Sequence, residues 1–352
     1  MTQTKRNSSF ELLRIIAIFL IVSYHFVNHS YLTYANYDAL TSSDYFIQIL
    51  YLFGRPACAL FALISGYFTV NSKFTKNYYA KIITLFIKTA LYSLISLLIY
   101  RFIFNFSIDL EDFIESCIFI LDHWYIRMYI IIMLLAPFIN RLLKSLNKNE
   151  FRRLLAINFI IYILLNTFLN YSIDLGDLYF MFFYYIFGAY ARLHKNAERK
   201  NIHNLYISLG CALLMILSVF CLDTLANILK SDYIFAHALY FKKYNNLLSF
   251  GFAYYLFLFF SNIHFENRTI NTIASTVLGI YIIHDNRFIR DLIWRKWELS
   301  FDFYSNPLMY YLIKVFSVLI LCIIIDLLFT NTIEKLINRI SYRMIPEQKE
   351  NP

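Results

Sequence analysis

Long apolar runs alternate with short polar stretches along almost the entire chain of 352 residues. Most runs reach the ~17–25 residues with which a helix crosses the roughly 30 Å hydrocarbon core of a bilayer. Ten runs predict ten transmembrane helices, at about 10–28, 46–70, 82–104, 118–140, 154–171, 178–193, 205–222, 245–262, 271–286 and 308–329. We therefore expect an all-α polytopic membrane protein with one integral-membrane domain over residues 1–352. Its bundle covers about 10–329, and a short tail covers 330–352.

The composition supports a membrane protein and argues against several other classes of protein. Hydrophobic residues make up 59% and charged residues 16% of the chain, against about 45–50% and 25% in soluble domains. The five cysteines are scattered without the spacing of a metal or redox motif, so we expect packing residues and no metal. The net charge of +9 resides mostly in the loops, so it does not indicate binding to nucleic acid.

The charges of the loops predict an orientation. Cations crowd alternate connections, namely Lys5 and Arg6; Lys73, Lys76 and Lys81; Arg141, Lys144, Lys148, Arg152 and Arg153; Arg192, Lys195, Arg199 and Lys200; Arg268; and Lys335, Arg339, Arg343 and Lys349. The early loops between them carry acids, namely Asp38 and Asp44; Asp109, Glu111, Asp112 and Glu115; and Asp174 and Asp177. The positive-inside rule then places both termini in the cytoplasm.

The last two external loops are basic too, which indicates either a solvated surface or an attraction for an anionic glycan. Their cations are Lys230, Lys242, Lys243, Arg287, Arg290, Arg295 and Lys296.

Arg14 and His25 lie eleven residues apart within the first apolar run. At about 100° and 1.5 Å per residue, both side chains share one helix face and are separated by roughly 16 Å along the axis. Ionisable groups inside a membrane segment are costly and commonly functional. Alternatively, Arg14 snorkels to the headgroups and His25 is a packing residue. The common face of the two residues favours a functional pair.

Four short motifs follow one another along the chain. They are Phe10-Glu11-Leu12-Leu13-Arg14 with His25; Leu60 to Ser65-Gly66-Tyr67; His123-Trp124-Tyr125 with Ala136-Pro137; and Gly279-Ile280-Tyr281-Ile282-Ile283-His284. Together they resemble the family 3 acyltransferases, integral-membrane enzymes that O-acylate bacterial surface glycans. The resemblance covers about residues 8–330. In the family the third motif is a Trp-aromatic helix that closes on proline.

The chain departs from the family in two places. Members often have paired arginines in the first cytoplasmic loop, where this chain has Lys76 and Lys81. Lysine keeps the charge but cannot bind phosphate through a planar fork. Many members also carry an extracellular hydrolase-like domain, whereas this chain ends at Pro352. We therefore expect it to acylate its acceptor directly or through a separate extracellular transferase.

The resemblance and the residue chemistry together predict the catalytic and donor-binding residues. His25 is expected to act as a general base or to carry the acyl group covalently. Arg14 at the cytoplasmic mouth suits acyl-coenzyme A, and Glu11 either orients it or forms a plain ion pair with it. Gly66 permits close approach of a neighbouring helix or of the pantetheine arm. The predicted acyl-coenzyme A site comprises Arg14, Glu11, Ser65, Gly66, Tyr67, Lys76 and Lys81.

Further polar residues are expected as acceptor-binding or supporting groups, most of them near the outer half of the first helix and Arg55 at mid-depth in the second. They are Arg55, His123, Trp124, Arg127, Tyr281, His284 and Asp285. Lys88 and Lys314 also fall within apolar runs, and we expect both to snorkel to the membrane surface.

We thus expect a multi-pass enzyme of the bacterial plasma membrane. It would transfer an acetyl group from cytoplasmic acetyl-coenzyme A to a hydroxyl of a cell-envelope or exopolysaccharide, with membrane lipid, the glycan and a possible second copy as partners. The alternative is a transporter or flippase of lipid-linked saccharide, which would also need buried charges. Such proteins commonly show inverted repeats and broken helices, and we find no such symmetry in a chain with only seven Gly and five Pro. An accessory subunit without an active site is disfavoured by the Arg14 and His25 pair.

Overall fold

The computed structural model describes residues 7–103, 110, 114, 123–169, 175–194 and 201–345. All regular elements within these ranges are helices, as the apolar runs predict. Some expectations fall outside the described residues. They are the basic pair Lys5 and Arg6, the loop acids at 109, 111, 112, 115 and 174, the loop cations at 195, 199, 200 and 349, and the first residues of the fourth predicted span, 118–122.

Within the described residues, seven helical segments are long and apolar enough to cross a membrane. They are α1 (Ser8–His29), α2 (Ser42–Thr69), α3 (Lys76–Phe102), α5 (Trp124–Ser145), the segment Lys148–Phe168, α9 (Asn201–Leu229) and the segment Pro307–Arg343. The fifth of these joins α6 (Lys148–Phe159) and α7 (Leu165–Phe168) through a π-helical turn, Ile160–Leu164. The last joins α14 (Pro307–Phe329) and α15 (Lys335–Arg343) through the π-helical turn Thr330–Glu334. All seven coincide with predicted spans.

The other three predicted spans correspond to shorter helices. They are α8 (Gly176–Leu193), α11 (Leu247–Ser261) and the pair α12 (Arg268–Ser275) and α13 (Val277–His284), which is interrupted at Thr276. The count of about ten transmembrane helices therefore stays a prediction. The loops add α10 (Asp232–Ala236), a 3₁₀ turn at Tyr240–Lys242 and a π-helical turn at Leu292–Lys296.

Local side chains explain where several helices begin. The Asn7 side chain accepts a hydrogen bond from the Ser9 N–H at the start of α1. Thr41 and Asp44 form a capping box at α2, and Asn147 with Glu150 forms another at α6. Such caps satisfy N–H groups that the first helical turn leaves without intrahelical partners.

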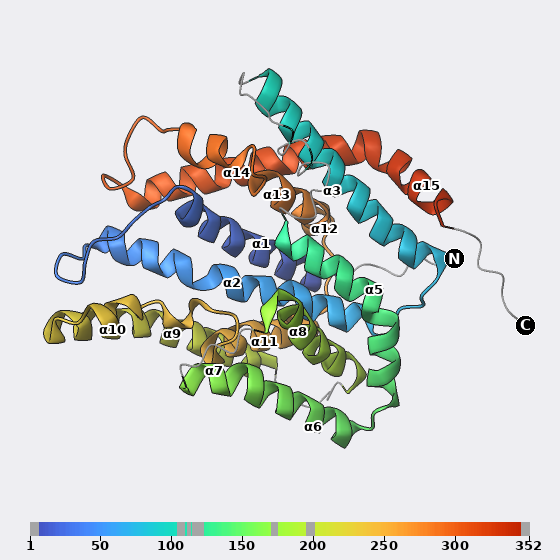
Figure 1. The fold of residues 1–352 in the computed structure, drawn as a ribbon, viewed down its shortest axis with the longest axis horizontal. Helices are drawn as coiled ribbons and strands as arrows, with labels where there is room; N and C mark the ends of the chain where they lie inside the picture. Colours follow the sequence, from blue (N-terminus) through green and yellow to red (C-terminus); the bar gives the residue numbers. More distant parts are fainter. Residues whose placement is uncertain are drawn as a thin grey trace, which may run out of the picture.

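Helix α5 continues past Pro137 and ends at Ser145, so the proline lies inside the helix, as the predicted span of 118–140 implies. Proline removes one backbone donor and kinks a helix, but membrane helices tolerate it where neighbouring groups satisfy the freed carbonyl. Figure 1 shows α5 changing direction along its length before it joins α6.

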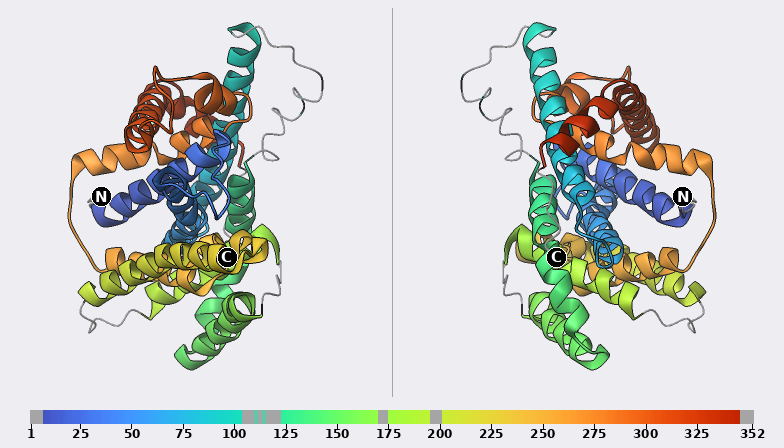
Figure 2. Two further views of the ribbon diagram at one scale, coloured as in Figure 1. Left: turned by 90° about the vertical axis from the view of Figure 1, so that its left-hand side faces the viewer. Right: turned by 90° about the vertical axis from the view of Figure 1, so that its right-hand side faces the viewer.

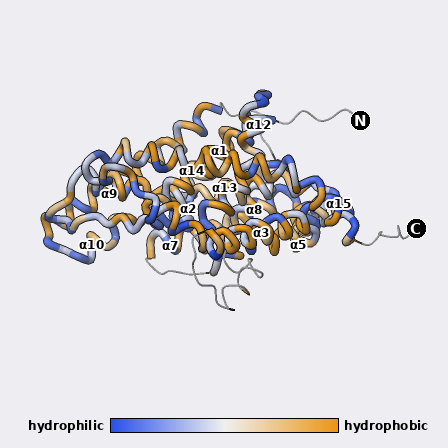
Figure 3. The backbone as a smooth tube through the Cα atoms, turned by 90° about the horizontal axis from the view of Figure 1, so that it is seen from above, coloured by the Kyte–Doolittle hydropathy of each residue, from blue (hydrophilic) through white to orange (hydrophobic). Residues whose placement is uncertain are grey.

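Helices α1 and α2 lie at the centre of the molecule (Figure 1). Helix α2 packs most extensively against α1 and α8, and α11 packs against α9. Helices α3, α14 and α15 lie on one side of this centre, and α6 to α9 lie on the other (Figure 1). Hydrophobic positions fill the middle of the molecule, and hydrophilic positions gather toward its two ends (Figure 3). This distribution suits a bundle that spans a hydrocarbon layer.

The close contact between α2 and α8 depends on two glycines. A Cβ atom added to Gly66 would collide with the backbone carbonyl of Tyr185, and one added to Gly188 would collide with that of Leu63. Small residues let helix backbones approach closely in a membrane. Of the two uses expected for Gly66, the structure therefore supports helix packing.

The loops meet in two groups, which define two ends of the bundle. At the Ser8 end, the segment between α11 and α12 passes the start of α1 (Figure 2), and the Asn7 side chain donates to the Ile263 carbonyl at 3.1 Å. At the His29 end, the Tyr304 hydroxyl donates to the Thr33 carbonyl at 3.1 Å, and Tyr34 packs edge-on against Phe235. The loop before α12 thus lies at the opposite end of the bundle from the loops that follow α1, α9 and α13.

Two lysines expected to snorkel are buried instead, so that expectation is wrong. The Lys88 ammonium lies 3.0 Å from Asp326 Oδ1, which also accepts a 2.6 Å hydrogen bond from the Tyr92 hydroxyl. A Cβ atom on Gly279 would occupy the place of the Asp326 side chain. Lys314 is fully buried, with its ammonium 4.8 Å from the centre of the Trp297 ring. Carboxylate partners thus hold the Lys88 ammonium inside the protein, whereas the Lys314 ammonium has no hydrogen-bond partner within the described part of the chain.

Candidate active site

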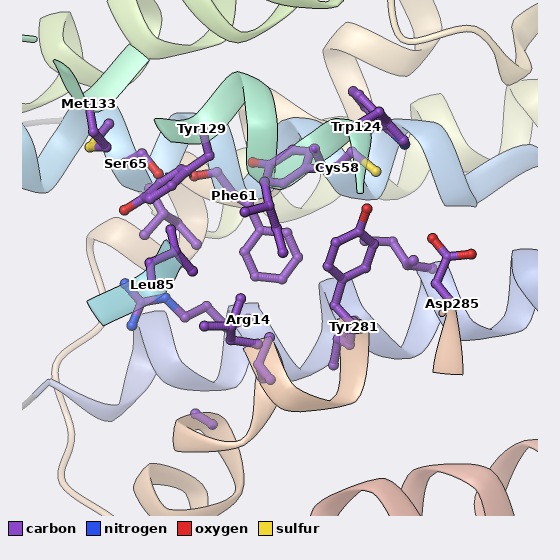
Figure 4. A pocket seen from close by; sticks show the side chains of 18 of the residues that line it. Arg14, Cys58, Phe61, Ser65, Leu85, Trp124, Tyr129, Met133, Tyr281 and Asp285 are labelled. Atoms are coloured by element: carbon purple, nitrogen blue, oxygen red, sulfur yellow. Dashed lines mark hydrogen bonds between the residues drawn. The ribbon is translucent and has the colours of Figure 1, made fainter. Parts of the chain in front are cut away.

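A cavity of about 800 Å³ extends along α1 between α2, α3, α5, α12 and α13. Arg14 and His25 both line it, so the shared helix face predicted from their spacing is the face that meets the cavity. In Figure 4, Arg14 lies near Leu85, Ser65 and Tyr129 toward one end, whereas Tyr281 and Asp285 lie toward the other. The cavity therefore joins the Ser8 end of the bundle to the region of His25.

At the Ser8 end, Arg14 is held by an ion pair within its own helix. Its Nη1 donates to Glu11 Oε1 at 2.8 Å, and the Glu11 side chain is only 5% exposed against 29% for Arg14. The burial of Glu11 favours the orienting role over a plain surface pair. Ser65 and Lys81 line the same cavity. This end is therefore cationic and bears hydrogen-bond donors, as an anionic ligand requires.

At the His29 end, two histidines from distant parts of the chain meet. His25 Nδ1 lies 2.8 Å from His284 Nε2, and His284 Nδ1 lies 2.5 Å from the Ile280 carbonyl oxygen. His29 Nε2 lies 2.8 Å from Asp285 Oδ1, which is 3.7 Å from His25 Nδ1. The last residue of α13, His284, and the C-cap residue Asp285 therefore supply both hydrogen-bonded neighbours of this face of α1.

The hydrogen bonds select one tautomer of His25. A carbonyl oxygen only accepts, so His284 Nδ1 must carry a proton toward Ile280. In neutral His284, Nε2 then accepts and His25 Nδ1 donates. This leaves His25 Nε2 as the ring nitrogen with a free lone pair. The His25 side chain is 12% exposed. A histidine oriented in this way can accept a proton from a bound hydroxyl.

Several other predicted residues also line the cavity. They are Arg55, Trp124, Tyr281 and Asp285. The Arg55 guanidinium lies 5.7 Å from the centre of the Tyr244 ring. The Tyr281 hydroxyl is buried without a hydrogen-bond partner among the described residues.

The remaining predicted residues do not line the cavity. Tyr67 faces Arg192, which donates to its hydroxyl at 3.1 Å, and the Lys76 ammonium lies 4.5 Å from the centre of the Tyr342 ring. Gly66 lies in the α2–α8 interface. These three residues are engaged by other helices, so the geometry does not place them at the expected donor site.

His123 is the N-cap residue of α5 and Arg127 lies in its first turn, and both also stay outside the cavity. His123 is fully buried, and both its ring nitrogens lack a hydrogen-bond partner within the described part of the chain. Its ring centre lies 5.7 Å from that of Tyr281. Glu11 and His284 do not line the cavity either. Each contacts a residue of α1 that does: Glu11 contacts Arg14, and His284 contacts His25.

Sequence reasoning missed several lining residues, among them Asn28, His29 and Arg290. A helical signal existed for the first two, because positions three and four after His25 share its face. No local signal marks Arg290 beyond its place in a basic loop.

His25, His29 and Asp285 also have the residue types of a transition-metal site, with ligand atoms all within 4.8 Å of one another. In this structure the same atoms take part in the hydrogen bonds described above.

Residues 7–327 match a family model described as an acyltransferase domain, that of acyltransferase family 3. The chain therefore belongs to this family, as the four motifs indicate. Together with the long apolar helices, membership identifies a multi-pass membrane acyltransferase. Comparisons with curated proteins and with solved structures gave no match.

Proposed function

We propose that this enzyme transfers an acetyl group from cytoplasmic acetyl-coenzyme A to a hydroxyl of a bacterial envelope polysaccharide or exopolysaccharide. The observation that carries the proposal is the cavity lined by Arg14 near one end and by His25 near the other. Donor and acceptor can meet in it from opposite sides of a membrane. Family membership supports acyl transfer over the transporter alternative, for which no feature of the described residues speaks independently.

The donor binds at the Ser8 end in this proposal. Positive loops at this end favour a cytoplasmic location, and Arg14 with Lys81 supplies charge for the phosphates or the thioester carbonyl of acetyl-coenzyme A. Glu11 fixes the Arg14 guanidinium through their 2.8 Å ion pair. The apolar lining between the ends, which includes Ile18, suits the uncharged part of a pantetheine arm.

In the proposed reaction the acetyl group moves from the thioester sulfur of acetyl-coenzyme A to the hydroxyl oxygen of the acceptor. His25 Nε2 accepts the proton of the acceptor hydroxyl as that oxygen attacks the thioester carbonyl. The C–S bond then breaks, the imidazolium returns the proton to the thiolate, and an ester and free coenzyme A result. His284 serves as a positioning residue, because it holds Nδ1 of His25 protonated and Nε2 free. A covalent acyl-His25 would form at the same Nε2 atom.

The test is the acetyl content of surface glycan, measured by mass spectrometry in a deletion strain that carries His25→Ala. General base catalysis contributes about 10²–10⁴-fold, so the glycan should lose its acetyl groups while the protein stays in the membrane. His237→Ala changes a histidine of the outer loops that lies outside the cavity and should restore acetylation. Normal acetylation by a well-expressed His25→Ala protein would reject the catalytic role.

A further inference from the structure

A second cavity, of about 420 Å³, opens at the His29 end of the bundle. It shares Asn28, His29 and Arg290 with the first cavity. The shared residues lie one helical turn beyond His25 on α1 or on the segment that follows α13. The two cavities thus meet next to the catalytic histidine, and the second one has no role in the donor half of the reaction.

The walls of this second cavity have features of a saccharide site. Tyr31 and Tyr51 contribute aromatic surface. The Tyr51 hydroxyl donates to Asn28 Oδ1 at 2.9 Å, which orients the amide and leaves its N–H groups to donate. The Arg295 guanidinium lies 3.4 Å from the centre of the Tyr31 ring, and its Nε donates to the His29 carbonyl at 3.3 Å. Fixed aromatic faces and an oriented amide suit the apolar face and the hydroxyl groups of a sugar.

Positive charge is in excess at the junction of the two cavities, which is formed by the shared residues Asn28, His29 and Arg290. Asp285 is engaged by His29, and Asp291 lies 3.5 Å from Arg295. The Arg290 side chain, by contrast, has no ion pair or hydrogen bond within the described part of the chain. The junction therefore offers a guanidinium whose donors are free.

A further cation lies close by. The Lys242 ammonium is 5.2 Å from the centre of the Tyr51 ring. Burial is the largest cause that lowers the pKa of Lys242, and the charges of Arg55 and Lys243 lower it further. An anionic ligand nearby would be attracted by these cations.

We propose that the second cavity binds the acceptor and that the acceptor is an anionic saccharide, whose carboxylate or phosphate is bound by Arg290. This inference rests on the proposed function and names its substrate class. A guanidinium matches a carboxylate or phosphate through two parallel hydrogen bonds. Four residues of helix separate His25 from His29, or about 6 Å. Because Arg290 and His25 both line the first cavity, the anionic group would lie on the acylated sugar or on a nearby sugar.

The test uses matched pairs of charged and neutral probes with the purified full-length chain in phosphatidylcholine nanodiscs. One pair is trigalacturonate and its methyl ester, and the other is glucose 1-phosphate and methyl glucoside. Calorimetry should show that at least one charged probe binds about 10- to 150-fold more tightly than its neutral partner, the range for a charge-assisted hydrogen bond. Arg290→Gln should remove this preference, and Arg290→Lys should restore part of it.

Arg287→Gln is the matched control, because Arg287 is a nearby arginine that lines neither cavity. It should leave the preference unchanged. Equal binding of charged and neutral probes, no binding of any probe, or equal weakening by Arg287→Gln would overturn the inference. Loss of the preference in nanodiscs that contain phosphatidylglycerol would also overturn it, because Arg290 would then bind a lipid headgroup.

The same preparations separate this inference from the proposed function. Acetyl-coenzyme A binding is measured beside each saccharide titration. Donor binding without a charge preference would reject the anionic acceptor alone. A charge preference without donor binding would instead reject acetyl transfer and leave an anionic-saccharide site.

Discussion

The contact between His25 and His284 can be tested by a double-mutant cycle. His25→Ala should lower the rate by about 10²–10⁴-fold, the usual contribution of a general base. His284→Ala removes one hydrogen bond of 2.8 Å. A net hydrogen bond contributes about 0.5–1.5 kcal/mol, so this variant should lose about 2- to 12-fold at 1.4 kcal/mol per decade. Its loss is the smaller one because His25 keeps its imidazole and loses only its orientation.

The coupling between the His25 and His284 substitutions decides whether His284 acts through His25. If His284 acts only through His25, its removal should change the rate less than about twofold once His25 is alanine, since residues that act as a unit are not additive. The assay is the initial rate of thiol release from acetyl-coenzyme A in membranes of a deletion strain that contain the native acceptor. Losses that multiply in the double variant would refute the positioning role of His284.

A second variant guards against misfolding. His284 is fully buried, and alanine there leaves a void that costs stability. His284→Gln keeps most of the volume and offers a carbonyl oxygen to the His25 Nδ1–H, so it should recover most of the rate. If His284→Gln folds but is as slow as His25→Ala, His284 has a chemical role beyond accepting this hydrogen bond.

Three further predictions concern donor binding, orientation and stability. Arg14→Lys should weaken acetyl-coenzyme A binding by about 10- to 150-fold in calorimetry, because ammonium cannot reproduce a guanidinium fork. In a background without the native cysteines, a cysteine at Asp232 should react with an impermeant thiol reagent in intact cells, whereas one at Ser145 should not. Asp326→Asn should destabilise the protein by less than the ~3–5 kcal/mol of a fully broken buried pair, because the buried Lys88 ammonium loses its 3.0 Å contact with Asp326 but keeps a 3.5 Å contact with Glu334.

Each of these three predictions has an outcome that would contradict it. Undiminished donor affinity in Arg14→Lys would mean that Arg14 contributes only charge, and no binding by the folded wild type would revive the transporter alternative. Labelling at position 145 from outside would reverse the orientation. Asp326→Asn is followed by thermal unfolding in detergent, with Lys88→Met/Asp326→Leu as the control that removes both charges. An unchanged unfolding midpoint in Asp326→Asn would show that the pair contributes little.

The sequence by itself determined the local features of this protein. Apolar run length predicted the seven helical segments of the described residues that are long enough to cross a membrane, since the hydrocarbon thickness fixes how many residues a span needs. Helical periodicity placed Arg14 and His25 on one face, and both line the cavity. The motifs indicated the family that the whole-chain match confirms. These features depend on residues near one another in the chain, so a single sequence contains them.

Only the tertiary structure decided which helices meet. His284 lies 259 residues from His25 in sequence, and no periodicity relates them. Gly66 was expected to face either a neighbour or a pantetheine arm, and the packing of α2 on α8 decided for the neighbour. Lys88 was expected at the membrane surface because its partner, Asp326, lies on a distant helix. Contacts between helices follow from the shapes and charges of two surfaces at once, and a pattern along one segment describes only one of them.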